Sequence, residues 1–139
     1  MKTKINSEEF AQRMGAYSHG YSVDLGNSIM IFTTGQIALD KNGNVVYPND
    51  AEKQAEFIYQ SLEKILNESG ASLDDVIKTT VYLTNMSDFS KVSPIRNKYL
   101  KSSEPASTLV EVSKLVKDGC VVEIEVIAVK EKQNEKQEK

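Results

Sequence analysis

The segment CVVEIEVIAV, residues 120–129, places acidic side chains inside an otherwise apolar strand. Alternation along a strand puts Glu123 and Glu125 on the face opposite Ile124. An acidic side chain at such a position can take part in a functional cleft, so Glu123 is a candidate site residue. The alternative is an acidic residue that faces solvent at the edge of a sheet.

A second candidate stands where an irregular segment becomes a strand. Residues 104–109 read EPASTL and lead into an alternating pattern, so Ser107 lies at the start of the strand. Such junctions often hold binding residues, because a rigid strand fixes their position. No Ser-His-Asp order is evident. We therefore expect Ser107 to hydrogen-bond a ligand or to serve only the strand edge.

Three further residues could take part in chemistry. His19 is the only histidine and titrates near neutral pH, although a structural hydrogen bond in a loop is the alternative. Arg96, one of two arginines, could bind a carboxylate or lie in solvent or an interface. Cys120 has no base near it in the sequence and, as the only cysteine, forms no internal disulfide or cysteine metal cluster. No metal site is expected.

Strands are predicted first among the elements that must position these residues. Residues 21–26 and 27–35 read as two strands joined by a Gly-Asn turn. The second is apolar on both faces, which predicts a central strand. KNGN at 41–44 predicts a hairpin turn that leads into a short strand at 45–47. Residues 1–13 are polar and are expected to be extended or partly helical.

Two helices and three more strands follow. An apolar stripe predicts a helix that is capped by Asn49 or Asp50 and ended by Gly70. A second helix is expected to reach about Lys101, with a break or restart at Pro94. The remaining strands are predicted at 76–84, 107–112 and 120–129.

This order of elements predicts a single α+β domain over residues 1–129, with two helices on one face of a mixed sheet. The other face is also apolar, and a partner subunit would cover it. The segment 130–139 is charged and is expected to be a disordered tail.

The composition bounds the partners of this chain. Its 139 residues carry a net charge of −3 and a pI of about 5.3, so no global field attracts nucleic acid. No stretch approaches 18 apolar residues, and the N-terminus lacks the apolar run of a signal peptide. We expect a cytoplasmic protein that does not enter a membrane.

Five segments together resemble one family. They occur in the family's order and spacing and read MGAYSHG, GNSIMIFTTGQI, SLDDVIKTTVYLTNMSDFSKV, EPASTLVEV and VVEIEVIAV. The family is RidA, the YjgF-type reactive intermediate deaminases, also described as endoribonuclease L-PSP proteins. The resemblance covers residues 14–129. It implies a chorismate-mutase-like α+β fold and a homotrimer whose ligand clefts lie between subunits.

The resemblance also implies an activity. RidA proteins hydrolyse enamines and imines, such as 2-aminoacrylate, to a 2-oxo acid and ammonia without a metal or organic cofactor. Glu123 matches the glutamate that orients the attacking water, Gly35 matches the glycine of the TTGQ turn, and Tyr17 matches a cleft tyrosine. A basic groove or paired histidines, which RNA cleavage would need, are lacking from the sequence.

Ser107 departs from the family pattern, because active members carry there an arginine that grips the substrate carboxylate. Truncating such a charge-assisted contact costs on the order of 2–5 kcal/mol. A loss of about 3 kcal/mol weakens capture roughly 100-fold. His19 and Arg96 also replace residues usual in the family, and both are candidates for shaping recognition.

Three functions are therefore open. The first is an enamine or imine hydrolase whose substrate is altered by Ser107. The second is a non-catalytic small-molecule binder or regulator that uses the intersubunit cleft. The third is a protein-interaction trimer with a vestigial cleft.

Overall fold

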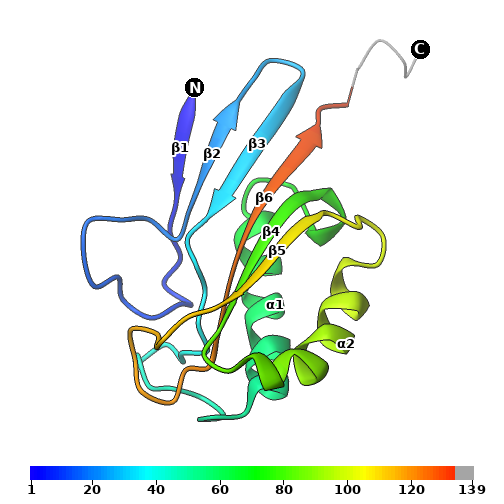
Figure 1. Ribbon diagram of the computed structural model, residues 1–139. Helices are drawn as coiled ribbons and strands as arrows, with labels where there is room; N and C mark the ends of the chain where they lie inside the picture. Colours follow the sequence, from blue (N-terminus) through cyan, green and yellow to red (C-terminus); the bar gives the residue numbers. More distant parts are fainter. Residues whose placement is uncertain (134–139) are drawn as a thin grey trace.

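A six-stranded mixed sheet with two helices along one face forms the fold in the computed structural model, which describes residues 1–133 (Figure 1). The strands are β1 (Lys2–Ile5), β2 (Gly20–Asp24), β3 (Ser28–Thr33), β4 (Val76–Leu83), β5 (Ala106–Glu111) and β6 (Val122–Glu131). The helices are α1 (Ala51–Asn67) and α2 (Phe89–Leu100), with 3₁₀ turns η1 (Leu73–Asp75) and η2 (Met86–Asp88).

The sheet has the strand order β1-β2-β3-β6-β4-β5. Strands β4 and β5 run parallel, because α2 carries the chain back between them, and all other pairs are antiparallel. The predicted α+β class, with two helices on one face of a mixed sheet, is confirmed. The last strand, β6, lies between β3 and β4 near the middle of the sheet.

The hydrophobic core lies between this sheet and α1. On β6 the alternate residues Val122, Ile124 and Val126 are buried against it. The helix contributes the predicted stripe, which comprises Ala51, Ala55, Ile58, Leu62, Ile65 and Leu66, all buried. Asp50 caps the helix by accepting a hydrogen bond from the Lys53 backbone N–H at 3.0 Å. Asp50 rather than Asn49 is therefore the N-cap.

The predicted strand at 45–47 is wrong, and the strand at Lys2–Ile5 was not predicted. Because one strand replaces the other, the order β-β-β-α-β-α-β-β is still the predicted one. Residues 45–47 form no strand, since Val45 makes only an isolated bridge to Leu39. The first strand is β1, which pairs with the outer edge of β2. Lys2 and Lys4 on β1 are exposed, because an edge strand needs few apolar residues. Because residues 1–13 are mostly polar, they show no apolar alternation from which this strand could be predicted.

The predicted break at Pro94 is also wrong, because α2 runs through it without interruption. A proline inside a helix removes one backbone hydrogen bond. Contacts beyond it hold the helix onto α1: Tyr99 stacks on Tyr59 with ring centroids 5.2 Å apart, and Lys98 pairs with Glu56 at 2.9 Å. These contacts offset the lost bond.

The C-terminal end of the sheet extends past residue 129. Strand β6 continues to Glu131, and the Lys132 backbone N–H donates to the Asn27 carbonyl at 2.9 Å. The rest of the tail predicted at 130–139 falls on residues 134–139, which lie outside the described part of the chain. Among the described residues, no helix combines the length and apolar character that a bilayer crossing requires.

Gln54, buried in α1, ties the helix to the start of β6. Its Nε2 donates to the carbonyls of Gly119 at 2.7 Å and Tyr47 at 3.0 Å. Its Oε1 accepts a hydrogen bond from the Val121 backbone N–H at 2.9 Å. This one amide thus fixes the segment that leads directly into Glu123.

Replacing Gln54 with alanine should destabilise the protein by about 2–4 kcal/mol, because buried backbone groups lose their partners and a cavity forms. Urea unfolding followed by circular dichroism measures this loss. The matched control is Gln60→Ala on the exposed face of the same helix, which should change stability by less than about 0.5 kcal/mol. Equal effects of the two substitutions would contradict the assigned role of Gln54.

Candidate functional site

Glu123 lies on the sheet face turned away from the helices, opposite Tyr82 of the neighbouring strand β4. Its side chain is half-buried. Burial, and to a smaller extent the nearby Glu125 carboxylate, raise the pKa of the Glu123 carboxyl group. Tyr82 donates a hydrogen bond to Glu125 at 2.9 Å, whereas no hydrogen bond lowers the pKa of Glu123. A carboxyl group with a raised pKa in a cavity is of the kind that can serve as a general base.

Gly35 lets this carboxylate rest directly against the backbone. Gln36 and Ile124 exchange backbone hydrogen bonds of 2.8 and 3.1 Å, which fix the segment after β3 alongside β6. A Cβ atom at position 35 would lie 2.9 Å from the Glu123 carboxyl carbon and closer still to Oε2. Only glycine leaves this space open. The requirement is one of space and not of backbone conformation.

Four of the predicted site residues line one small cavity of about 110 Å³, namely Tyr17, His19, Gly35 and Glu123. The loop between β1 and β2 contributes Phe10, Ala11 and Met14 to another wall. The sequence analysis did not identify these wall residues. Two apolar residues in an otherwise polar segment, Phe10 and Met14, were the signal that could have identified them.

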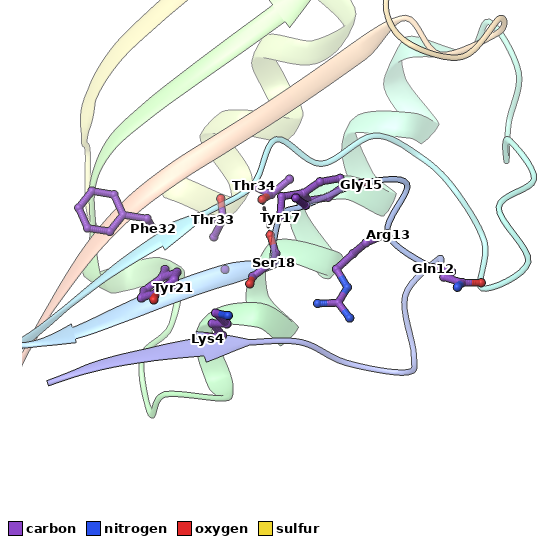
Figure 2. Close-up of a pocket in the computed structure, with 12 residues that line it drawn as sticks. Lys4, Gln12, Arg13, Gly15, Tyr17, Ser18, Tyr21, Phe32, Thr33 and Thr34 are labelled. Atoms are coloured by element: carbon purple, nitrogen blue, oxygen red, sulfur yellow. Dashed lines mark hydrogen bonds between the residues drawn. The ribbon is translucent and has the colours of Figure 1, made fainter.

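Tyr17 stands at the boundary between two cavities. Its ring is 42% exposed, and its hydroxyl accepts a hydrogen bond from the Met14 backbone N–H at 3.2 Å. Tyr17 lines the Glu123 cavity and also a larger neighbouring cavity of about 700 Å³, drawn in Figure 2. Gln12 and Thr34 are likewise shared by the two cavities.

His19 is buried, and backbone groups of the β1–β2 loop occupy its ring nitrogens. Nδ1 accepts from the Ser7 backbone N–H at 3.1 Å, and Nε2 lies 3.3 Å from the Ala11 carbonyl oxygen, to which it can donate. The Phe10 ring meets the imidazole edge-on, with centroids 5.2 Å apart. Burial is the main cause that lowers the pKa of His19. These contacts hold the wall of the Glu123 cavity in place.

Ser107 and Arg96 line a different cavity, which has a volume of about 620 Å³. Ser107 pairs with Thr79, whose side chain is buried on the helix face of the sheet. Glu123 lies on the opposite face of the sheet, so within a single chain the sheet separates Ser107 from Glu123. Glu123 and Ser107 accordingly line two separate cavities.

Arg96 is held at this second cavity by neighbours on its own helix. Its Nη2 donates to Ser93 Oγ and to Asn97 Oδ1, both at 3.2 Å, and its guanidinium lies 5.8 Å from the Phe89 ring centroid. In the described part of the chain no carboxylate forms an ion pair with Arg96. The guanidinium therefore keeps donors for an anion.

The turn between α2 and β5 gives the second cavity its shape. Glu104 has a left-handed backbone with φ of 43°, and its N–H donates to the Leu100 carbonyl at 2.9 Å. This bond ends the helical turns and directs Pro105 and Ser107 into the edge strand. The left-handed position was missed, because such positions usually carry glycine.

Metal ligands and a reactive thiol are the remaining possibilities. Over residues 1–133, no three His, Cys, Asp or Glu side chains converge in a way that could hold a metal ion. Cys120 is buried, and burial raises the pKa of its thiol, which disfavours the nucleophilic thiolate.

Comparison with known proteins gives a consistent match. Residues 9–130 fit the family model described as Endoribonuclease L-PSP. A RutC family protein of Pyrococcus abyssi is 38% identical over 130 residues, covering 94% of this chain and 98% of that protein. The 2-iminobutanoate/2-iminopropanoate deaminase of Mus musculus is 34% identical over 125 residues, covering 90% of this chain and 89% of that protein.

Solved structures agree with the fold. RidA from an Antarctic Psychrobacter species is 31% identical with a TM-score of 0.77, covering 91% of this chain and 98% of that one. Escherichia coli TdcF with bound serine is 30% identical with a TM-score of 0.77, covering 92% of this chain and 98% of that one.

The stability of the His19 contacts should depend on pH. Because the folded pKa is lowered, the contribution of His19 is present above its unfolded pKa of about 6.5 and is lost as the pH falls. Protonation of Nδ1 removes the acceptor for Ser7, a bond worth about 1 kcal/mol. Thermal unfolding at pH 7.5 and pH 5.5 should show a larger fall in Tm for the wild type than for His19→Gln. Equal falls would refute this role.

Gly35→Ala should destabilise the protein by about 1–3 kcal/mol, because the new methyl group meets the Glu123 carboxylate. Combining it with Glu123→Ala should remove most of that cost, which a double-mutant cycle by urea unfolding measures. Gly15→Ala is the matched control, since a Cβ there meets nothing closer than 3.8 Å. An unchanged cost in the Glu123→Ala background would show that the clash lies elsewhere.

Proposed function

This chain belongs to the Endoribonuclease L-PSP family, the RidA-type proteins, and from that premise we propose that it hydrolyses reactive enamine or imine intermediates. The products are a carbonyl compound, such as a 2-oxo acid, and ammonia. The observation that carries the proposal is the half-buried Glu123 carboxylate, which lies against Gly35 in a cavity and has a raised pKa.

The chemistry required of the protein is modest. An imine carbon is already electrophilic, so the site must hold the substrate and activate one water. Glu123 takes a proton from the water as its oxygen adds to the carbon. The proton then passes to the nitrogen, which gives a carbinolamine. The hydroxyl proton of this carbinolamine moves to the amine as the carbon–nitrogen bond breaks, so that ammonia leaves and the carbonyl group forms. Because the base must be ionised, turnover should fall as the pH drops through the raised pKa of Glu123.

The substrate range is proposed to differ from that of relatives with an arginine at position 107. One neutral hydrogen bond from the Ser107 hydroxyl contributes only about 1 kcal/mol. Arg96 lines the same cavity from α2 and has no carboxylate partner among the described residues. We therefore assign the contact with a substrate anion to Arg96, with Ser107 hydrogen-bonding beside it.

We propose that the chain forms a homotrimer, because this assignment requires a second copy. Glu123 and Ser107 face opposite sides of the sheet, so a complete site needs a second copy to bring the two cavities together. The face away from the helices also exposes Phe32, at 38%. Contact between copies would bury this ring. We propose that the cleft joins the Glu123 cavity of one chain to the Ser107 cavity of the next.

The missing arginine at position 107 favours one alternative, a non-catalytic small-molecule binder or regulator that uses the same cleft. RNA cleavage, which the family description names, is not proposed. The single histidine has both ring nitrogens in contact with backbone groups, and the net charge is −3. A nuclease would need free acid–base groups and a basic groove.

An imine-hydrolysis assay tests the proposal. An amino-acid oxidase generates imines from a panel of amino acids, and semicarbazide competes for them. Wild type should hydrolyse its imine substrates before semicarbazide traps them, and so lower the rate of semicarbazone formation. Glu123→Gln should lose roughly 100-fold or more of the hydrolysis rate. The matched control is Glu125→Gln, whose carboxylate is held by Tyr82 on the same strand face.

Ser107→Arg distinguishes the two functions. An inert wild type with an active Ser107→Arg variant would mean a competent scaffold diverted to another ligand, which supports the binding alternative. If wild type, Glu123→Gln and Ser107→Arg are all inert on every imine, the hydrolase proposal is wrong.

A further inference from the structure

We propose that the buried hydroxyl group of Tyr59 is a positioning group for Arg96, and that it accepts a hydrogen bond from the guanidinium while Arg96 holds an anion. The proposal rests on the anion contact assigned to Arg96 in the proposed function, but it does not depend on turnover. Tyr59 lies on α1 and lines neither the Glu123 cavity nor the Ser107 cavity. It therefore acts only through Arg96.

The Tyr59 hydroxyl group is an exception within the core. The side chain is fully buried, and among the buried side-chain polar atoms of residues 1–133 its hydroxyl oxygen alone lacks a hydrogen-bond partner. Such a group costs free energy, because it gives up its hydrogen bonds to water without replacing them. A phenylalanine ring would fill the same space without that cost. Packing alone therefore does not account for the hydroxyl group.

Helix α2 packs on the Tyr59 ring. Tyr99 stacks on it, with ring centroids 5.2 Å apart and an angle of 13° between the planes. The Tyr99 hydroxyl is already engaged, since it donates to Glu56 Oε1 at 2.5 Å and accepts from Gln60 Nε2 at 3.4 Å. Arg96 precedes Tyr99 by about one helical turn, so the two residues lie on the same side of α2. Arg96 is thus the candidate partner for Tyr59.

The charge of Arg96 acts on this hydroxyl group. Burial is the main cause that raises the pKa of Tyr59, and Arg96 is the charged group that lowers it. The phenol therefore stays neutral at ordinary pH and keeps lone pairs that can accept a hydrogen bond. A guanidinium has five N–H donors and does not lose its proton. The two groups are therefore chemically complementary.

The hydrogen bonds that Arg96 now makes occupy the edge that an anion needs. Nε and Nη2 donate to Asn97 Oδ1 at 3.3 and 3.2 Å, and Nη2 also donates to Ser93 Oγ at 3.2 Å. A carboxylate binds most strongly when it accepts two parallel N–H bonds from one edge of a guanidinium. An anion that binds this edge must therefore displace Asn97.

Nη1 is the group that can bind Tyr59 in this exchange. The hydrogen bonds of Arg96 within residues 1–133 use Nε and Nη2, which leaves Nη1 without a partner. Nη1 is the nitrogen opposite the Nε–Nη2 edge, so it turns away from an anion held by that edge. A hydrogen bond from Nη1 to Tyr59 offsets the loss of Asn97 and fixes the plane of the guanidinium.

Titration of the full-length, ¹⁵N-labelled protein with pyruvate, a 2-oxo acid, tests this role. Because the chain has two arginines, the side-chain Nε–H region holds two signals, and Arg13→Lys identifies the signal of Arg96. This signal should shift saturably in the wild type. Tyr59→Phe keeps the ring and removes the hydroxyl group, and it should weaken pyruvate binding roughly fivefold, as the loss of one hydrogen bond predicts.

Tyr99→Phe is the matched control, because it removes the hydroxyl group of the other ring in the same stack. That hydroxyl is bonded to Glu56, so affinity for pyruvate should change by less than about twofold. Urea unfolding without pyruvate adds a second readout. Tyr59→Phe should be at least as stable as the wild type, because its hydroxyl group has no partner in the free protein.

Four outcomes would overturn the proposal. The first is equal pyruvate affinity in the wild type and Tyr59→Phe. The second is an Arg96 signal that does not shift at about 10 mM pyruvate. The third is equal weakening by Tyr59→Phe and Tyr99→Phe, which would show a general effect of the ring stack. The fourth is a free Tyr59→Phe protein that is less stable than the wild type, because the hydroxyl group would then have a partner without an anion.

The imine-hydrolysis assay gives an independent result. A pyruvate response that depends on Tyr59, in a protein that is inert toward every imine, would support the positioning role and refute the hydrolase proposal. Turnover by a protein whose Arg96 signal does not respond to pyruvate would refute the positioning role and leave the hydrolase proposal standing.

Discussion

The structure depends on one constraint, which is that β6 must satisfy two environments at once. It pairs with β3 on one side and β4 on the other, so its backbone is fixed across the middle of the sheet. One face carries Val122, Ile124 and Val126 into the core under α1. Because side chains alternate along a strand, Glu123 must then lie on the opposite face, outside the core.

Holding a partly buried acid there imposes requirements on distant parts of the chain. The bridge between Gln36 and Ile124 brings Gly35 against the carboxylate, so only a residue without a side chain is accommodated. Gln54 fixes the entry into β6 from α1. His19 ties down the loop that closes the cavity. Each contact comes from a different element, yet all bear on the surroundings of one carboxylate.

Much of this arrangement was predictable from sequence, because it rests on periodicity. Alternation in residues 120–129 gave the face of Glu123, and the apolar stripe gave α1. The edge strand β1 was missed since its lysines follow no apolar pattern. The break at Pro94 was predicted from local cost alone, whereas the stacking of Tyr99 on Tyr59 is a tertiary contact that no local pattern shows.

The separation of Ser107 from Glu123 was also out of reach of the sequence. Which face Ser107 occupies depends on the parallel register of β5 against β4, and strand order is not encoded in either segment alone. The hydrogen-bond partners of His19 could not be predicted from sequence either, because Ser7 and Ala11 contact it only through backbone atoms. Because nearly every residue carries the same backbone groups, such contacts do not depend on residue type.

The placement of the two arginines favours ligand binding over structural stabilisation. The chain carries 17 basic residues, of which only Arg13 and Arg96 are arginine, and each lines a cavity. The three ion pairs among the described residues all use lysine. A guanidinium gains most when it meets a planar anion with both prongs. In the proposed function, Ser107 on β5 stands where the resemblance places an arginine, and Arg96 on α2 is the guanidinium that lines the same cavity. The proposal thus moves anion recognition from a strand to a neighbouring helix without moving it out of the cavity.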